Sequence, residues 1–218
     1  MKNHLISYPR SGNHWVRFIV EWFSGKPTKG INKEDKPIYV NLVNKDTLSH
    51  VSGTDYILFK NHWYTSIKPN ENLILIVRNP KEAIMRHKNK FTDNDLNWFV
   101  GLIKSFHNHK GNKILIYYED LLTQPKNNIE KILKFLNILD EKKLSIFMDN
   151  YEELFNESIN VYDNTGKKEI ISGGKGRVSK TKGKKLNFHS NSLTNEDNQR
   201  FINYLKNSGV KKYIIRYE

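Results

Sequence analysis

The chain has 218 residues, 37% of them hydrophobic, and a formal net charge of +13, so it is long enough for one domain with a single sizeable core. Its lack of cysteine excludes disulfides, thiolate catalysis and cysteine-based zinc sites, and no aliphatic stretch approaches the ~20 residues that a membrane-spanning helix needs. The positive charge fits either non-specific attraction to polyanions or a site for a strongly anionic ligand, and charge alone does not distinguish the two.

The chain opens with a predicted strand, a short polar loop and a helix. An apolar run at Leu5–Ile6 leads into the loop Tyr8–Gly12, and apolar residues at helical spacing then predict a helix that ends before Ser24. Such a loop directs several backbone N–H groups to one spot in front of a helix N-terminus, which suits a phosphate or sulfate group. Arg10 and Ser11 add side-chain donors. Because the sequence starts directly with a strand, we expect no signal peptide and a cytoplasmic location.

Two further strands are predicted before residue 80. Residues 26–55 show no clear element, apart from a candidate short helix near 45–50, and Tyr56–Lys60 is a predicted strand. Leu73–Val77 is a continuous aliphatic run, as expected of a parallel strand that is covered on both faces. Pro80–Lys88 is a predicted helix, since proline is favoured as a first helical residue.

The following stretch continues the alternation of helices and strands. Thr92 can cap a helix that has a buried apolar stripe, and Lys113–Tyr118 is a predicted strand. A helix is expected from Pro125, and residues 141–158 look helical. Strands that alternate with helices imply a parallel sheet with helices on both faces.

The last stretch is less regular. Residues 163–190 are rich in Gly and Lys and are predicted to form a mobile basic loop, Thr194 begins a last helix, and Tyr213–Tyr217 is a candidate edge strand. No repeat or linker divides the chain, so we expect one domain over residues 1–218 with the α/β class of fold, as a three-layer α/β/α arrangement around a central parallel sheet.

Polar clusters follow the predicted strands. Arg10–Ser11, His62, Arg78 and Tyr118–Glu119 each come directly after a strand. Because ligands of parallel sheets bind beyond the carboxyl ends of the strands, we expect these clusters to converge on one crevice.

The first loop resembles the 5′-phosphosulfate-binding loop of the sulfotransferases, which usually reads Y-P-K-S-G-T-T-W. The nucleotide-triphosphate loop G-x-x-x-x-G-K-[ST] is absent. Arg10 stands in place of the usual Lys, and Asn13 and His14 stand in place of the two Thr. The positions that match the family are Tyr8, Pro9, Ser11, Gly12 and Trp15.

Four later segments resemble the same family in the same order. Phe59–His62 is similar to the K-[ST]-H segment that carries the catalytic base, and Val77–Ala83 to the 3′-phosphate-binding V-x-R-N-P-K-D. Tyr117–Leu121 is similar to the Y-E-D-[LM] segment whose Tyr contacts adenine. Gly174–Val178 resembles the late R-K-G-x-x-G segment that closes over the 3′-phosphate, although Gly174 stands where the first Arg is usual.

The resemblance implies a P-loop-NTPase-like fold and sulfuryl transfer from 3′-phosphoadenosine 5′-phosphosulfate (PAPS) to an acceptor hydroxyl or amine. On this interpretation His62 is the general base, Arg10 stabilises the leaving oxygen, Lys60 adds positive field, and no metal is required. PAPS carries two separate phosphate centres and therefore needs two cationic sites. The implied donor-binding residues are Arg10, Ser11, Gly12, Asn13, His14, Trp15, Arg78, Arg86, Tyr118, Lys175, Gly176 and Arg177.

Several alternatives remain open from the sequence. His14 is a rival base, Trp15 and Tyr118 suit either adenine stacking or plain core packing, and Arg86, where a Ser is usual, either supplies charge or faces solvent.

A kinase-like phosphate-transferring enzyme would need a Walker lysine, which the sequence lacks. A non-enzymatic polyanion or nucleic-acid binder would explain the charge but not the ordered set of strand-end residues. We expect a small-molecule or glycan acceptor, no nucleic acid and no membrane span, with the oligomeric state open.

Overall fold

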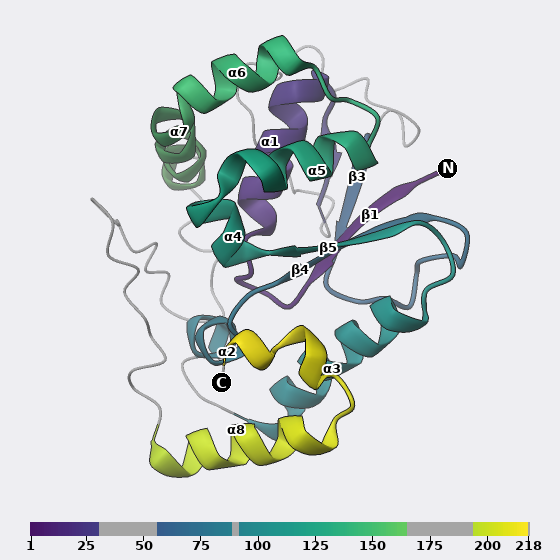
Figure 1. The fold of residues 1–218 in the computed structure, drawn as a ribbon, viewed down its shortest axis with the longest axis vertical. Coiled ribbons are helices and arrows are strands. Elements are labelled where there is room, and N and C mark those ends of the chain that lie inside the picture. Colours follow the sequence, from purple (N-terminus) through teal and green to yellow (C-terminus); the bar gives the residue numbers. More distant parts are fainter. Residues whose placement is uncertain (31–55, 89–91, 165–193, 218) are drawn as a thin grey trace.

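The computed structural model describes residues 1–30, 56–88, 92–164 and 194–217, and it places helices on both faces of a five-stranded parallel sheet (Figure 1). The strands lie in the order β2-β3-β1-β4-β5, so the first strand is central. This arrangement confirms the predicted three-layer α/β fold. The strands are β1 (Asn3–Ser7), β2 (Thr28–Lys29), β3 (Leu58–Asn61), β4 (Asn72–Val77) and β5 (Lys113–Tyr117).

The pairing register brings the carboxyl ends of four strands to one level. Ser7 at the end of β1 pairs with Ile76 of β4, and Val77 of β4 pairs with Tyr117 of β5. On the other side, Ile6 of β1 pairs with Asn61, the last residue of β3. The loops that leave these strands therefore start side by side at one edge of the sheet.

The helices form two layers, seen above and below the sheet in Figure 1. The upper layer comprises α1 (Asn13–Ser24), α4 (Tyr118–Thr123), α5 (Pro125–Phe135), α6 (Glu141–Asp149) and α7 (Tyr151–Asn164). The lower layer comprises α2 (Pro80–Lys88), α3 (Asp93–Asn108), α8 (Asn195–Asn207) and two short 3-10 helices, η4 (Lys211–Tyr213) and η5 (Ile215–Tyr217). None of the described helices is long and apolar enough to cross a membrane.

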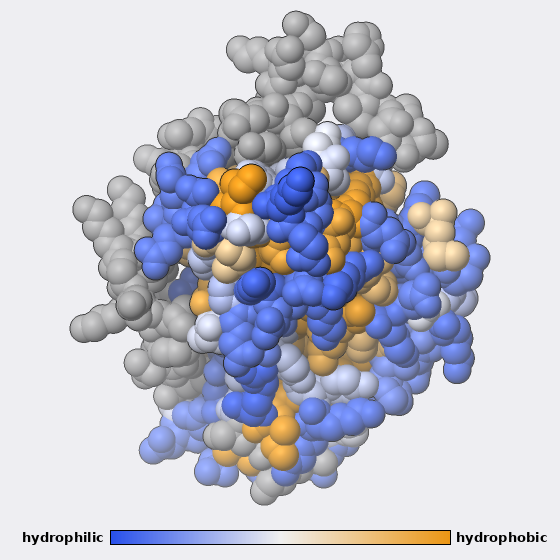
Figure 2. All heavy atoms as spheres, turned by 45° about the horizontal axis from the view of Figure 1, so that its top comes forward, coloured by the Kyte–Doolittle hydropathy of each residue, from blue (hydrophilic) through white to orange (hydrophobic). Residues whose placement is uncertain are grey.

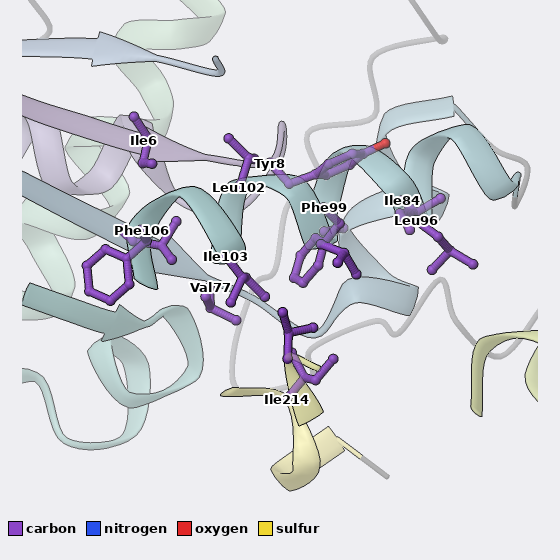
Figure 3. Close-up of a cluster of buried hydrophobic side chains, with 14 of the residues drawn as sticks. Ile6, Tyr8, Val77, Ile84, Leu96, Phe99, Leu102, Ile103, Phe106 and Ile214 are labelled. Atoms are coloured by element: carbon purple, nitrogen blue, oxygen red, sulfur yellow. The ribbon is translucent and has the colours of Figure 1, made fainter. Parts of the chain in front are cut away.

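The inner strand β4 contributes to both hydrophobic cores, because its side chains alternate between the faces of the sheet. Leu75 and Val77 pack into the lower core, and Ile74 and Ile76 into the upper one, all at most 1% exposed. Figure 3 shows the lower core, in which residues from β1, β4, α2 and α3 meet Ile214 from the end of the chain. The aliphatic run is thus covered on both faces, as predicted.

The predicted helix starts are confirmed where the structure describes them. Pro80 is the first residue of α2, and Pro125 is the first residue of α5. The hydroxyl oxygens of Thr92 and Thr194 accept hydrogen bonds from backbone N–H groups three residues later, at Asp95 and Asp197. These caps satisfy donors that would otherwise lack partners at the starts of α3 and α8.

Some predicted boundaries are wrong. Residues 141–158 form two helices that are separated at Asn150, and α7 continues to Asn164, so the first two residues of the predicted basic loop are helical. Thr28–Lys29 is an edge strand that the sequence does not reveal, since two residues are too short for a pattern. The candidate helix near 45–50 and the rest of the basic loop lie outside the described residues.

The candidate edge strand at Tyr213–Tyr217 is also wrong, because this stretch forms η4 and η5. Val210 and Ile214 are buried in the lower core, whereas Ile215 is exposed. Lys212, halfway between the two buried residues, is exposed, so the burial does not alternate as it would on one face of a strand. Figure 2, which brings the top of Figure 1 forward, shows hydrophilic side chains over most of the visible face, with hydrophobic atoms in the gaps between them.

Candidate active site

The ends of three strands contact the last residue of β1 or the loop that follows it. The Nδ1–H of His62, after β3, donates to the carbonyl oxygen of Ser7 at 2.8 Å. Arg78, after β4, donates from Nη1 to the carbonyl oxygen of Arg10 at 2.9 Å. The ring of Tyr118, after β5, lies directly against Gly12. The residues expected at the sheet edge are therefore brought together around the loop Tyr8–Gly12.

The loop reaches α1 through two residues with left-handed backbone. Arg10 has φ 64° and Gly12 has φ 98°. Gly12 is the N-cap of α1, and Asn13 is the first helical residue. A β-carbon at position 12 would overlap with Cδ2 of Tyr118, which explains why a glycine stands where that ring packs.

Substituting Gly12 with alanine should destabilise the protein more than the same change at Gly25. Both glycines have positive φ, but a β-carbon at Gly25 would meet no atom within 4 Å. Gly25→Ala should therefore lose only the backbone cost of about 1–2 kcal/mol, whereas Gly12→Ala should lose roughly a further 1–3 kcal/mol through the overlap with Tyr118. Urea unfolding of the two variants measures the difference, and equal losses would show that Tyr118 does not hold the loop.

Buried polar groups of the loop lack partners among the described residues. Ser11 is fully buried and its hydroxyl makes no hydrogen bond there, and Asn13 is 6% exposed with neither amide atom paired. No hydrogen bond or ion pair in the described part of the chain engages the guanidinium of Arg10. Since buried polar groups are normally satisfied, an unpaired hydroxyl and amide at a helix N-terminus suit a bound oxyanion, and Arg10 supplies a cation in the same loop.

Arg78 is held tightly at the end of β4. Its side chain is buried, its guanidinium lies 4.4 Å from the centroid of the Tyr118 ring, and its Nη2 lies 3.6 Å from Glu82. Burial lowers the pKa of Arg78, but a guanidinium remains protonated at neutral pH. Arg78 therefore supplies a fixed positive charge at the loop.

A second arginine shares the carboxylate of Glu82. Arg86 Nε donates to Glu82 Oε1 at 2.5 Å. Arg78, two residues before α2, also pairs with Glu82, so the carboxylate lies four residues from each arginine in the sequence. Arg86 is half-buried, so the side chain does not simply face solvent. Two guanidinium groups on one carboxylate leave a net positive charge beside the loop.

The backbone after Arg78 is positioned by Glu119 in α4, which is in turn held by η5 near the end of the chain. The N–H of Asn79 donates to Glu119 Oε1 at 2.9 Å, and the hydroxyl of Tyr217 donates to Glu119 Oε2 at 2.5 Å. Arg216 makes a bidentate ion pair with Asp120 at 2.6 and 2.9 Å. Glu119 thus links the ends of β4 and β5 to η5.

His62 has a defined hydrogen-bonding state. A carbonyl oxygen only accepts hydrogen bonds, so in the neutral ring the proton lies on Nδ1, toward Ser7, and Nε2 carries the lone pair. The side chain of Asn61 accepts the N–H groups of His62 and Trp63 at 2.8 and 3.0 Å, and Trp98 Nε1 donates to the carbonyl of His62 at 3.0 Å. The base candidate is therefore fixed in both tautomer and position.

His14, the rival base, is tied into the fold. Its Nε2–H donates to the carbonyl of Ser158 in α7 at 2.7 Å. Burial lowers the pKa of His14 to about 3, and the charges of Arg17 and Lys60 contribute to the lowering. His14 is therefore neutral at pH 7, and Lys60 lies close enough to act on its charge.

Trp15 lies within an aromatic cluster. It is 3% exposed, it stacks on Phe18 with ring centroids 5.5 Å apart, and its ring meets the edges of Tyr151 and Phe155 from α7. Core packing therefore covers most of the Trp15 side chain. Tyr118 is half-buried between Gly12 and Arg78.

His87 is a further histidine near the loop that the sequence did not single out. Burial lowers its pKa, and the positive charge of Arg10 adds to the effect. Its ring meets the edge of Tyr8, whose hydroxyl donates to Asp95 at 2.8 Å. No motif or spacing in the sequence marks His87, because its proximity to the loop depends on the path of α2.

The predicted residues Lys175, Gly176 and Arg177 lie outside the described residues. In the ranges that are described, no group of three or more His, Cys, Asp or Glu side chains could hold a metal ion. The described site thus consists of the loop after β1 and the ends of β3, β4 and β5.

Sequence comparisons connect the chain to sulfotransferases. The family model described as sulfotransferase domain matches residues 97–213. Curated relatives include WSCD family members of Aedes aegypti, 26% identical over 61% of this chain and 49% of the relative, and of Drosophila pseudoobscura pseudoobscura, 26% identical over 71% and 57%. The chain therefore spans about half the length of the curated relatives it matches.

Solved structures share the fold at low sequence identity. Mouse sulfotransferase SULT7A1 complexed with PAP superposes with a TM-score of 0.61 at 17% identity, over 99% of this chain and 87% of that one. Retinol dehydratase in complex with androsterone and the inactive cofactor PAP gives a TM-score of 0.60 at 15% identity, over 95% and 80%. Because the family model covers more than half of the 218 residues, the protein belongs to the sulfotransferase domain family.

Proposed function

We propose that the protein transfers a sulfuryl group from PAPS to an acceptor hydroxyl or amine by in-line displacement, with His62 as the general base. The observation that carries this proposal is that the buried polar groups of Ser11 and Asn13, in and just after the loop that also carries Arg10, have no hydrogen-bond partner among the described residues. A bound oxyanion would supply the hydrogen-bond acceptor that these donors lack. The bound PAP in the solved structures that share the fold supports the choice of donor.

The residues present suit both ends of such a donor. At the 5′ end, Ser11, Gly12, Asn13 and His14 surround the start of α1, where backbone N–H groups are available for an anion. At the 3′ end, the fixed charge of Arg78 is reinforced by Arg86. The resemblance to sulfotransferase motifs assigns the adenine to Tyr118 and Trp15. It assigns the 3′-phosphate also to Lys175, Gly176 and Arg177.

In the proposed reaction each residue has one task. PAPS supplies the sulfuryl group on a phosphate leaving group. His62 Nε2 takes the proton of the acceptor hydroxyl, whose oxygen forms a bond to sulfur as the bond from sulfur to the phosphate oxygen breaks. Arg10 neutralises the charge that develops on that phosphate oxygen, and Lys60 adds positive field. Fixed charges and positioning provide most of the catalysis in transfers of this kind.

Ligand-induced thermal stabilisation tests the proposal against its alternatives. Adenosine 3′,5′-bisphosphate at 100 times its Kd should stabilise the protein by about 2.7 kcal/mol, which corresponds to roughly 5–10 °C in Tm for a chain of this size. ATP with Mg²⁺ and random single-stranded DNA, at matched ionic strength, should give smaller shifts. A larger shift with ATP would favour a kinase-like enzyme, and one with DNA would favour a polyanion binder.

A further inference from the structure

An exposed tryptophan follows the proposed base directly. Trp63 is 53% exposed, and its indole stacks on Trp98 with ring centroids 4.3 Å apart and planes 5° from parallel. A tryptophan with one face packed and the rest open to solvent is unusual, because large aromatic side chains are mostly buried. The exposed face of Trp63 is therefore a candidate binding surface.

This surface is held rigidly relative to His62. Asn61 Oδ1 accepts the backbone N–H groups of both His62 and Trp63. Trp98, which supports the indole of Trp63, donates to the carbonyl of His62 at 3.0 Å and packs against Tyr8 with ring centroids 4.9 Å apart. The indole plane and the imidazole thus share one set of supports, so a ligand on the indole would have a fixed position relative to the base.

We infer that Trp63 binds a pyranose ring of a carbohydrate acceptor and presents one of its hydroxyls to His62. The inference rests on the proposed function, and it names the acceptor class of that same site. A sugar ring has an apolar face of C–H bonds that matches a flat indole, while its hydroxyls stay in contact with water and polar side chains. Thr65 and Ser66, which are polar and exposed, follow Trp63 closely in the chain.

A lipophilic acceptor fits this surface less well. Pockets for apolar small molecules enclose the ligand with several hydrophobic and aromatic side chains. The other large hydrophobic side chains that are exposed in the described ranges come from elsewhere in the fold, namely Met1 before β1, Ile146 on α6 and Ile215 on η5. Among the described residues, Trp63 is therefore a flat exposed surface with no other exposed large hydrophobic side chain next to it in the fold, which suits stacking on one face of a sugar.

The test compares acceptor binding by Trp63→Ala, Trp63→Phe and the control Ile146→Ala. Ile146 is an equally exposed hydrophobic residue, 55% exposed, on a helix of the opposite layer. With each protein saturated with adenosine 3′,5′-bisphosphate, binding of a panel of methyl pyranosides is followed by saturation-transfer NMR and the Kd is determined. The best pyranoside of the panel is then used as acceptor with PAPS, beside p-nitrophenol and cyclohexanol.

Trp63→Ala should raise the Kd and KM for the pyranoside by about 5- to 100-fold, the range that loss of one stacking partner produces. Trp63→Phe should recover most of the affinity, Ile146→Ala should match the wild type, and kcat should change much less than KM. The Kd for the bisphosphate should be unchanged in all three variants.

The outcomes separate this inference from the proposed function. If the wild-type protein fails to bind the bisphosphate, the proposed function itself is wrong. If it binds the bisphosphate and sulfates p-nitrophenol or cyclohexanol in preference to every pyranoside, or if Trp63→Ala binds the pyranoside as the wild type does, the carbohydrate inference is overturned while sulfuryl transfer stands.

Discussion

Replacing His62 with asparagine should lower turnover by about 10²- to 10⁴-fold, the usual contribution of a general base. Asparagine can still donate a hydrogen bond to the carbonyl of Ser7, so the local structure should survive. It cannot accept a proton at neutral pH, and the acceptor hydroxyl would then lose its proton without assistance. Steady-state kinetics with PAPS and a working acceptor measure the loss, and the Kd of adenosine 3′,5′-bisphosphate should stay close to that of the wild type.

The matched control is His14→Asn. His14 donates to Ser158 and has its pKa lowered to about 3 by burial, so it stays neutral and serves to join α1 to α7. This variant should lower stability and affinity for the bisphosphate more than the chemical rate. If His62→Asn turns over at nearly the wild-type rate while His14→Asn is inactive, the roles of the two histidines are reversed.

Replacing Arg78 with alanine should weaken bisphosphate binding by about 10- to 150-fold, as expected for losing hydrogen bonds to a charged group. The variant removes a buried positive charge and also the hydrogen bond that holds the carbonyl of Arg10. Arg78→Lys keeps the charge but not the planar fork that faces Tyr118, so it should recover affinity only in part. Isothermal titration with the bisphosphate measures both variants.

Arg10→Ala should show the opposite balance, with a larger loss in chemical rate than in bisphosphate affinity. Its guanidinium makes no hydrogen bond or ion pair within the described residues, and we assign it to the charge that develops on the leaving oxygen. Arg200→Ala is the control for removing a positive charge, because Arg200 forms an exposed pair with Asp93. Small and equal effects of Arg10→Ala and Arg78→Ala on binding and turnover would count against the assignment of the two arginines.

The parts of this fold that are local in sequence could be predicted from it. The aliphatic run of β4, the start of α2 at Pro80 and the cap at Thr92 each depend on a few adjacent residues. The position of the site followed from a general property of parallel sheets, that loops after neighbouring strands share one edge. The contact of His62 with the end of β1 and the contacts of Arg78 and Tyr118 with the first loop agree with that reasoning.

The features that the sequence did not reveal depend on contacts between distant segments. Trp63 and Trp98 lie in a loop and in α3, and no periodicity indicates that their rings stack. The link from Asn79 through Glu119 to Tyr217 joins residues that are far apart in the chain. The strand β2 exists through its pairing with β3 rather than through any pattern of its own.

The most direct test of the central proposal is transfer of labelled sulfur. The protein is incubated with PAPS carrying radioactive sulfur and a panel of sugars and phenols, and the labelled acceptor and adenosine 3′,5′-bisphosphate are quantified together. We expect equal amounts of sulfated acceptor and bisphosphate from the wild-type protein, with both reduced by about 10²-fold or more in His62→Asn. Bisphosphate binding without label transfer to any hydroxyl or amine in the panel, or transfer that is as fast in His62→Asn as in the wild type, would contradict this account.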